Sequence, residues 1–293
     1  MLYLFILGTI IGSFLNVIIL RAEKEEKITG RSYCPNCKKK LKWWELIPVF
    51  SFFILGGKCS ECKKKISWQY PLVELLTGIC FALTYNRLIQ LSFFNTSLNG
   101  SFGLDFCLAA LFLGLWLYFV SVLIVIAVYD LRTYYILDTV LYPAIIIAFL
   151  SQTLFSVLAW KKLIPFFEQT GPNFLGLGQY FFGTFNFPIN LIIGAGFYFV
   201  ILGILAYGSK GRAMGYGDPK LGIFLGALLL WPASLIALLL SFCFGGLVGL
   251  ITIVLKKKTM KSYLPFGPFL ALAGFIVFLF GDIILKGYFK LFS

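Results

Sequence analysis

The chain has 293 residues, of which 60% are hydrophobic and 13% are charged, and its formal net charge is +13. Soluble globular domains carry about 25% charged residues, so this composition excludes an ordinary soluble fold and indicates a protein that lies in a lipid bilayer. The chain contains no histidine, which excludes Ser-His-Asp and Cys-His nucleophilic catalysis and HExxH zinc proteases. Hydrolysis would have to use carboxylates, a Ser-Lys pair, or a metal held by cysteine and carboxylate ligands.

Eight apolar segments predict membrane-spanning helices, because a helix needs about 20 mostly apolar residues to cross ~30 Å of hydrocarbon. In chain order, the predicted spans are 2–20, 71–93, 106–128, 137–159, 189–208, 219–232, 234–255 and 264–285. The sixth is short, and Pro219 and Pro232 bracket it, so it is expected to be tilted, broken or re-entrant. The predicted fold class is an all-α polytopic membrane protein with a small four-cysteine loop domain.

The distribution of lysine and arginine predicts the orientation, because cytoplasmic loops retain positive charge. If the N-terminus is outside, 20 of the 25 basic residues lie in loops that face the cytoplasm. These loops are 21–70, 129–136, 209–220 and 256–263. Basic loops beside anionic lipid also explain the net charge, so membrane lipid is an expected partner and nucleic acid is not.

One segment outside the membrane differs sharply from the rest of the chain. Residues 21–70 carry 12 of the basic residues, five of the 12 acidic residues and four of the seven cysteines. They predict a cytoplasmic domain between a first transmembrane helix, 1–20, and a larger transmembrane domain, 71–293. Within it, Leu46–Gly57 is apolar but too short to span, so it is expected either to lie at the membrane interface or to pack on the cysteine loops.

Two CxxC pairs predict a metal site in this domain. Cys34 and Cys37 form the first pair, and Cys59 and Cys62 form the second; 21 residues separate the two pairs. Two short chelating turns that meet supply the four thiolates of a tetrahedral Zn²⁺ site, and such a closed site is structural because it leaves no position for water. Iron in the same ligands, a redox role and a disulfide framework are the alternatives, although a disulfide is disfavoured in the cytoplasm.

Two aspartates at the same predicted membrane face are the candidate catalytic pair. Asp130 follows the span 106–128, and Asp218 begins the next cytoplasmic-side helix after Gly215 and Gly217. The glycines would let the backbone bend or a substrate strand approach closely. Two carboxylates that share one proton can activate water and polarise a scissile carbonyl, as in aspartic proteases. The alternative is structural, with Asp130 paired to Arg132 or capping a helix and Asp218 as an N-cap.

Glu74 is a third acid at membrane depth. It lies one turn into the predicted span 71–93, close to Pro71. A buried charge in a membrane needs a partner or a cavity, so Glu74 is expected to be either structural or a substrate contact.

Seven segments, in order along nearly the full chain, resemble the type IV prepilin peptidase family. They are Gly12–Val17, the two CxxC turns, Pro71–Gly78, the segment around Asp130, Gly215–Leu221 and Pro265–Phe269. GxGD alone is a weak signal, but the ordered set is specific. Two features depart from the family: Ile136-Leu137-Asp138 lacks a proline that is common before this aspartate, and the loop 160–188 is longer than usual.

The resemblance implies a GxGD intramembrane aspartyl protease of the bacterial cytoplasmic membrane. Such an enzyme removes the basic leader of type IV prepilins or pseudopilins at the cytoplasmic face, and here Asp130 and Asp218 would be its catalytic pair. Many members also methylate the new N-terminus with S-adenosylmethionine as the methyl donor. The four-cysteine loop resembles that of these bifunctional members, so methyltransferase activity is expected as well.

Three other function classes fit parts of the sequence. A transporter or channel with a regulatory zinc loop fits the spans, but it does not explain two acids at one face, one of them after GxG. A non-catalytic scaffold would bind partners through its zinc domain, and loss of both aspartates would then leave its function intact. A Ser-Lys leader peptidase is the last of the three, but no Ser and Lys form a recognisable pair near the external surface.

Overall fold

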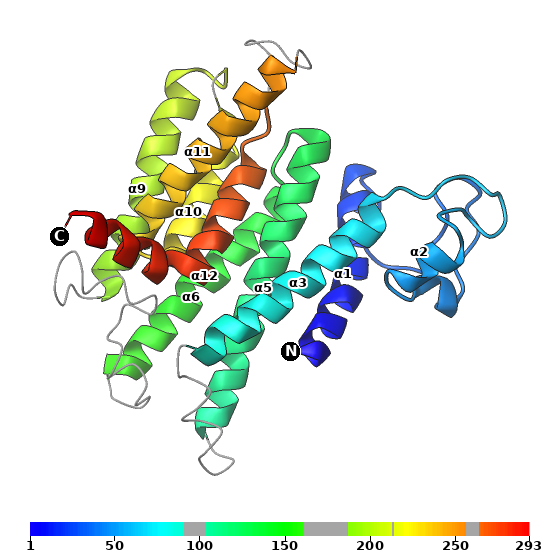
Figure 1. Cartoon of the computed structure of the whole chain (residues 1–293), viewed down its shortest axis with the longest axis horizontal. Coiled ribbons are helices and arrows are strands. Elements are labelled where there is room, and N and C mark those ends of the chain that lie inside the picture. The colour runs from blue at the N-terminus through cyan, green and yellow to red at the C-terminus, as the bar shows by residue number, and fades with distance from the viewer. Residues whose placement is uncertain (91–103, 161–186, 213, 256–263, 293) are drawn as a thin grey trace. The chain divides into compact units, whose positions relative to one another are not determined.

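A computed structural model describes residues 1–90, 104–160, 187–212, 214–255 and 264–292, which form helices joined by loops, with no named strand (Figure 1). The elements are α1 (Leu2–Glu23), η1 (Trp43–Leu46), α2 (Phe50–Ile54), α3 (Gln69–Gln90), α5 (Leu104–Thr133), α6 (Asp138–Trp160), α9 (Phe187–Gly208), α10 (Asp218–Leu229), α11 (Ala233–Val254) and α12 (Gly267–Phe292). The prediction of an all-α fold is confirmed. The predicted long loop 160–188 lies almost wholly outside the described residues.

Seven described helices are long and apolar enough to cross a membrane: α1, α3, α5, α6, α9, α11 and α12. They confirm the prediction of a multi-pass membrane protein. The predicted short span 219–232 is α10, a helix of only 12 residues. The predicted end of the span 106–128 was wrong: α5 continues to Thr133, so Asp130 lies inside its last turns and not after its end.

The chain divides into two compact units, Met1–Val125 and Ile126–Ser293, and the boundary falls inside α5. The predicted division at residues 20 and 70 is a different one and stays a prediction. In the first unit α1 packs along α3. A Cβ on Gly8 would lie 2.7 Å from Cα of Gly78, and one on Gly12 would lie 2.8 Å from Cα of Glu74. Small residues four apart therefore let the two helix backbones touch, as in many membrane helix pairs.

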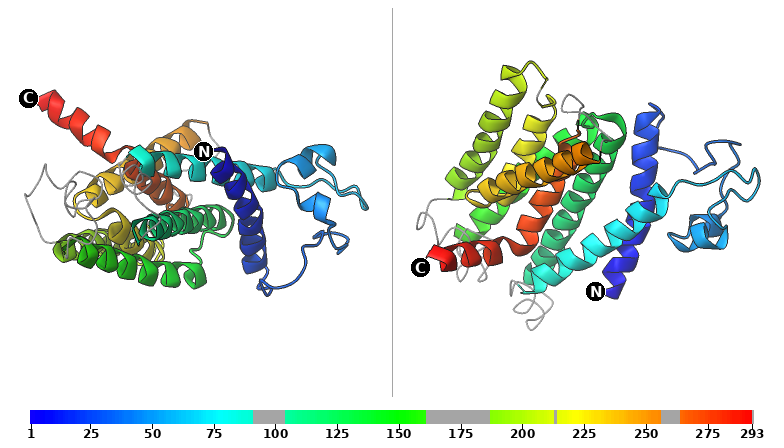
Figure 2. Two further views of the ribbon diagram at one scale, coloured as in Figure 1. Left: turned by 90° about the horizontal axis from the view of Figure 1, so that it is seen from below. Right: turned by 45° about the horizontal axis from the view of Figure 1, so that its top comes forward.

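In the second unit the short helix α10 forms the core. It packs against α6, α9, α11 and α12, and ten of its residues are buried (Figures 1 and 2). At its closest approach to α9, a Cβ on Gly226 would lie 2.3 Å from the carbonyl oxygen of Gly194. A helix that is apolar on all sides is stable when protein surrounds it. This burial explains why so short a helix is stable, and it holds the start of α10 in place.

Candidate active site and metal centre

Asp130 and Asp218 are both buried in the second unit. Asp130 lies in the last turns of α5 and is 4% exposed, whereas Asp218 is the first residue of α10 and is 5% exposed. The two carboxylates are near enough for the charge on Asp130 to act directly on Asp218. Two acids that repel each other in a poorly solvated site do not both ionise readily, and such a pair can share one proton.

Each carboxylate is held by one backbone N–H. The N–H of Gly267 donates to Oδ2 of Asp130 over 3.0 Å, and the N–H of Gly215 donates to Oδ2 of Asp218 over 3.1 Å. Gly217 and not Asp218 occupies the N-cap position of α10, and no side chain caps that position. The carboxylate of Asp218 therefore folds back over the GxG turn, so it does not act as the N-cap of the structural alternative. In both residues the hydrogen bonds to described groups use Oδ2, which leaves Oδ1 for a ligand.

The nearby glycines differ in how much room surrounds them. A Cβ on Gly267 would lie 2.7 Å from Oδ2 of Asp130, and one on Gly217 would lie 2.9 Å from Cβ of Ile136. Both distances are shorter than van der Waals contact. A Cβ on Gly215 would lie 3.5 Å from Oδ2 of Asp218, which is an ordinary contact. Gly217 and Gly267 thus allow close packing, whereas Gly215 is exposed beside the acid.

A salt bridge that the sequence analysis missed joins the starts of α6 and α10. Nζ of Lys220 lies 2.8 Å from Oδ2 and 3.0 Å from Oδ1 of Asp138, the first residue of α6. The same ammonium lies 5.2 Å from the ring centroid of Tyr142. Lys220 follows Asp218 by two residues, so the salt bridge fixes the turn of α10 that carries the acid. Sequence could have suggested it, because Asp138 and Lys220 lie at the same predicted membrane face.

Glu74 lies in the first unit, in the second turn of α3, and is 7% exposed. Its Oε2 accepts a hydrogen bond from the backbone N–H of Val49 over 2.7 Å. Its carboxylate therefore binds the loop before α2, a partner that no sequence pattern indicated.

The four cysteines of the two CxxC pairs come together. Their sulfur atoms all lie within 4.8 Å of one another, with Cys34 Sγ 3.9 Å from Cys62 Sγ and Cys37 Sγ 4.0 Å from Cys59 Sγ. These separations are about twice a disulfide bond length. They are close to the ~3.8 Å edges of a tetrahedron whose centre lies ~2.3 Å from each sulfur. The cluster could therefore hold a metal ion.

The two CxxC turns have the same conformation. In the first, the N–H of Lys38 donates to the carbonyl of Cys34, and Lys38 has a φ of 60°. In the second, the N–H of Lys63 donates to the carbonyl of Cys59, and Lys63 has a φ of 57°. Hydrogen bonds from the backbone N–H groups of Glu61 and Cys62 lower the pKa of the Cys59 thiol to about 7. Against a hydrogen bond from the Lys39 backbone, burial and the neighbouring thiols raise the pKa of Cys37 to about 11. Thiolates bind metal, so a thiol with a lowered pKa suits this site.

A buried arginine supports the loop that leads into the first turn. Arg21, at the end of α1, is 7% exposed. Its guanidinium donates to the backbone carbonyls of Lys27, Ile28, Thr29, Gly30 and Arg31. The loop 27–31 thus wraps around the Arg21 guanidinium, and these hydrogen bonds fix the path of the chain toward Cys34.

Known protein families match most of the chain. The model of the bacterial peptidase A24 N-terminal domain matches residues 6–88, and the model of the type IV leader peptidase family matches residues 117–250. No solved structure matches the chain.

Three similar proteins are each called prepilin leader peptidase/N-methyltransferase. That of Pseudomonas aeruginosa is 30% identical, over 97% of this chain and 91% of the relative. That of Aeromonas hydrophila is 32% identical, over 97% of this chain and 92% of the relative. That of Legionella pneumophila is 28% identical, over 95% of this chain and 90% of the relative. The similarity therefore includes both compact units.

Proposed function

Because this chain belongs to the type IV leader peptidase family, we propose that it is a prepilin leader peptidase in which Asp130 and Asp218 are the catalytic pair. The observation that carries the assignment is the pair of buried carboxylates, each held through Oδ2 by the backbone N–H of a glycine. A transporter would not require two acids so placed at the ends of two helices.

The chemistry follows from one proton shared between two carboxylates. The ionised aspartate removes a proton from water, and the resulting hydroxide attacks the carbonyl carbon of the scissile peptide bond. The protonated aspartate donates a hydrogen bond to the carbonyl oxygen and stabilises the charge that develops there. Transfer of a proton to the peptide nitrogen then breaks the C–N bond and releases the new amino terminus. The hydrogen bonds from Gly215 and Gly267 hold both acids in position throughout.

The expected substrate is a prepilin or pseudopilin with a basic leader. In the proposed orientation the N-terminus is outside, and the ends of α5 and α10 that carry the two aspartates face the cytoplasm. Gly215 is exposed next to Asp218, which supports a role in contacting the substrate backbone, whereas the tight packing of Gly217 supports a role in shaping the turn. We keep Glu74 as a candidate substrate contact, although its hydrogen bond to Val49 favours a structural role.

The four-cysteine cluster is proposed to hold structural Zn²⁺. Four cysteine sulfurs at near-tetrahedral separations are the donor set that zinc prefers, and they leave no open coordination position. The ion would tie the two CxxC turns together and take no part in hydrolysis.

The names of the relatives support a second activity, methylation of the new amino terminus. S-adenosylmethionine would supply the methyl group as an electrophile. We assign no residues to this donor. A methylation assay on the cleaved product, run with a labelled donor, tests the second activity independently of cleavage.

The test of the peptidase is cleavage of a purified prepilin by the reconstituted protein and by Asp130→Asn and Asp218→Asn. Each variant should cleave about 10²–10⁴-fold more slowly, the range that general acid–base catalysis contributes. Asp282→Asn, which changes an acid of α12 outside the proposed site, is the control and should cleave normally. Metal content and helix content must match the wild type. Normal cleavage by either variant would remove that aspartate from the pair, and no cleavage by wild-type protein would refute the assignment.

A further inference from the structure

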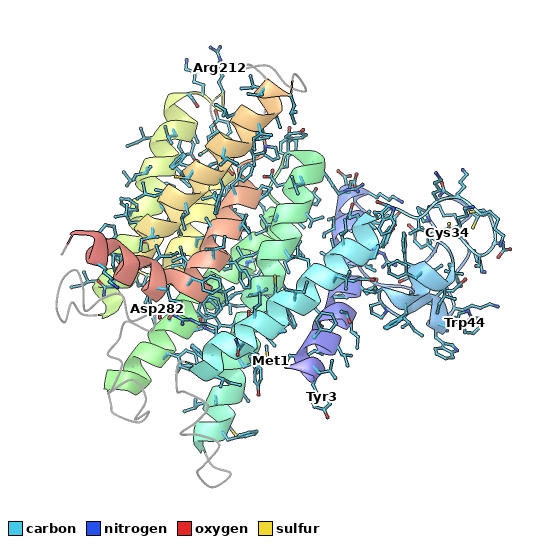
Figure 3. The ribbon with its side chains drawn as sticks, viewed as in Figure 1. Met1, Tyr3, Cys34, Trp44, Arg212 and Asp282 are labelled. Atoms are coloured by element: carbon cyan, nitrogen blue, oxygen red, sulfur yellow. The ribbon has the colours of Figure 1, made fainter. Side chains whose placement is uncertain are left out.

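The four-cysteine module, residues 24–68, exposes a group of large apolar side chains that we call the aromatic face. Its members, with their exposed fractions, are Trp43 (74%), Trp44 (45%), Phe50 (69%), Phe53 (59%), Ile54 (79%) and Trp68 (61%). The group is contiguous, because η1 contacts α2 and the ring centroids of Phe53 and Trp68 are 6.4 Å apart. Figure 3 shows Trp44 projecting outward from the module. Apolar surface of this kind is normally covered.

Contacts within the first unit place this face beside the start of the membrane helix α3. The hydrogen bond from Val49 to Glu74 ties the segment before α2 to the second turn of α3, about 7.5 Å along the helix from its start at Gln69. Phe52, buried on the inner side of α2, packs on Trp68 with ring centroids 4.8 Å apart. The aromatic face therefore lies beside the first turns of α3, close to the bilayer that this helix spans.

The backbone at the attachment point is strained, which shows how firmly the segment is held. Val49 has a φ of 63° and a ψ of −54°. A β-branched residue at positive φ is a rare outlier and persists only when surrounding contacts impose it. The hydrogen bond from this residue to the carboxylate of Glu74 is such a contact.

The charge of the module identifies what covers the face. Between residues 31 and 68 there are nine lysines and arginines and two glutamates. Most of these lysines are exposed, and Nζ of Lys42 lies 4.9 Å from the ring centroid of Trp44. Tryptophan is enriched at the headgroup level of bilayers, and lysine is attracted to the anionic lipid surface. The combination matches an interfacial membrane contact better than a protein interface, where lysine is depleted.

We propose that the aromatic face lies in the headgroup region of the bilayer, in the leaflet where α1 ends and α3 begins. Tryptophan and phenylalanine side chains occupy the boundary between headgroups and acyl chains, and Lys42, whose ammonium lies beside the Trp44 ring, contacts lipid phosphates. The module then rests on the membrane surface, with its metal-binding turns held close to the bilayer.

Depth-dependent fluorescence quenching tests the position of the face. The full chain is reconstituted in nanodiscs with phosphatidylglycerol, and five of its six tryptophans are changed to phenylalanine so that only Trp43 or only Trp68 remains. Lipids brominated near the headgroup end of the acyl chain should quench both strongly, whereas aqueous acrylamide should quench them weakly. The matched control has all six changed and Lys64→Trp added on the exposed side of the second CxxC turn. It should show the reverse pattern.

Either of two results would overturn the proposal. Quenching of Trp43 by acrylamide as strong as in the Lys64→Trp control would mean that the face is open to water. Protection of Trp43 from both quenchers would mean that protein covers it. Photolabelling of the unmodified protein by a phospholipid with a diazirine near its headgroup answers the same question if the tryptophan variants do not fold. Label on residues 43–54 is expected, and label confined to the spanning helices would refute the contact.

Discussion

The backbone N–H of Gly267 donates a hydrogen bond to Oδ2 of Asp130 over 3.0 Å, and the two residues are 137 positions apart in the chain. The start of α12 thus orients an acid on α5. Gly267 is the first residue of α12, where backbone N–H groups have no partner inside the helix and the helix dipole favours negative charge. The hydrogen bond holds Oδ2 of Asp130 in a fixed direction.

Replacement of Gly267 by alanine should therefore remove activity by displacing one carboxylate. The new Cβ would lie 2.7 Å from Oδ2 of Asp130, so either the acid or the helix must move. A displacement of about 1 Å in a catalytic group costs about 10²-fold in rate. Prepilin cleavage by Gly267→Ala should fall by about that factor while detergent-extracted protein stays folded. Gly249→Ala, where the structure leaves open space, is the control and should cleave at the wild-type rate. Equal rates for both variants would contradict the role of Gly267.

The two glycines of the GxGD turn should respond differently to alanine. A Cβ on Gly217 would lie 2.9 Å from Ile136, so Gly217→Ala should destabilise the protein by about 1–3 kcal/mol and lower kcat. A Cβ on Gly215 would meet nothing closer than 3.5 Å, so Gly215→Ala should fold normally and raise KM alone. Thermal unfolding in detergent and steady-state cleavage measure both effects. Similar losses for the two variants would show that the turn needs both glycines for the same reason.

The salt bridge between Lys220 and Asp138 should matter more for activity than for stability. Nζ of Lys220 is 2.8 Å from Oδ2 of Asp138, and the side chains are 31% and 47% exposed. Exposed ion pairs stabilise proteins by less than about 1 kcal/mol because water and salt screen them. Lys220→Met and Asp138→Asn should therefore unfold nearly like the wild type but cleave several-fold more slowly, because the start of α10 is less constrained.

A charge reversal tests whether Lys220 and Asp138 act through their salt bridge or separately. The double variant Asp138→Lys with Lys220→Asp should recover part of the activity that each single change removes, since the pair can form again in the opposite sense. Lys210→Met removes an exposed lysine from the preceding loop and should leave cleavage unchanged. A double variant no better than the worse single variant would indicate that Lys220 acts on the substrate and not through Asp138.

The membrane helices were predictable because one property, about 20 consecutive apolar residues, decides whether a helix can span. The two CxxC turns were predictable for a similar reason, since ligand spacing within each turn is local. The hydrogen bond between Gly267 and Asp130 was not, because it joins residues 137 positions apart and depends on how α12 packs. The end of α5 was placed too early for a related reason: the helix continues past the apolar run that ends at Val128, through the mixed residues 129–133.

Loss of Arg21 should loosen the metal-binding turns without touching the cysteines. Its guanidinium donates to five consecutive backbone carbonyls, from Lys27 to Arg31, three residues before Cys34. Hydrogen bonds to a charged donor contribute about 1.5–3 kcal/mol each, and methionine offers none. Arg21→Met should therefore lose zinc faster to a chelator and expose residues 24–33 to protease. Arg31→Met removes an exposed side chain from the same loop and should retain zinc as the wild type does. Equal zinc retention by both variants would mean that the cysteine turns hold their geometry independently of the loop around Arg21.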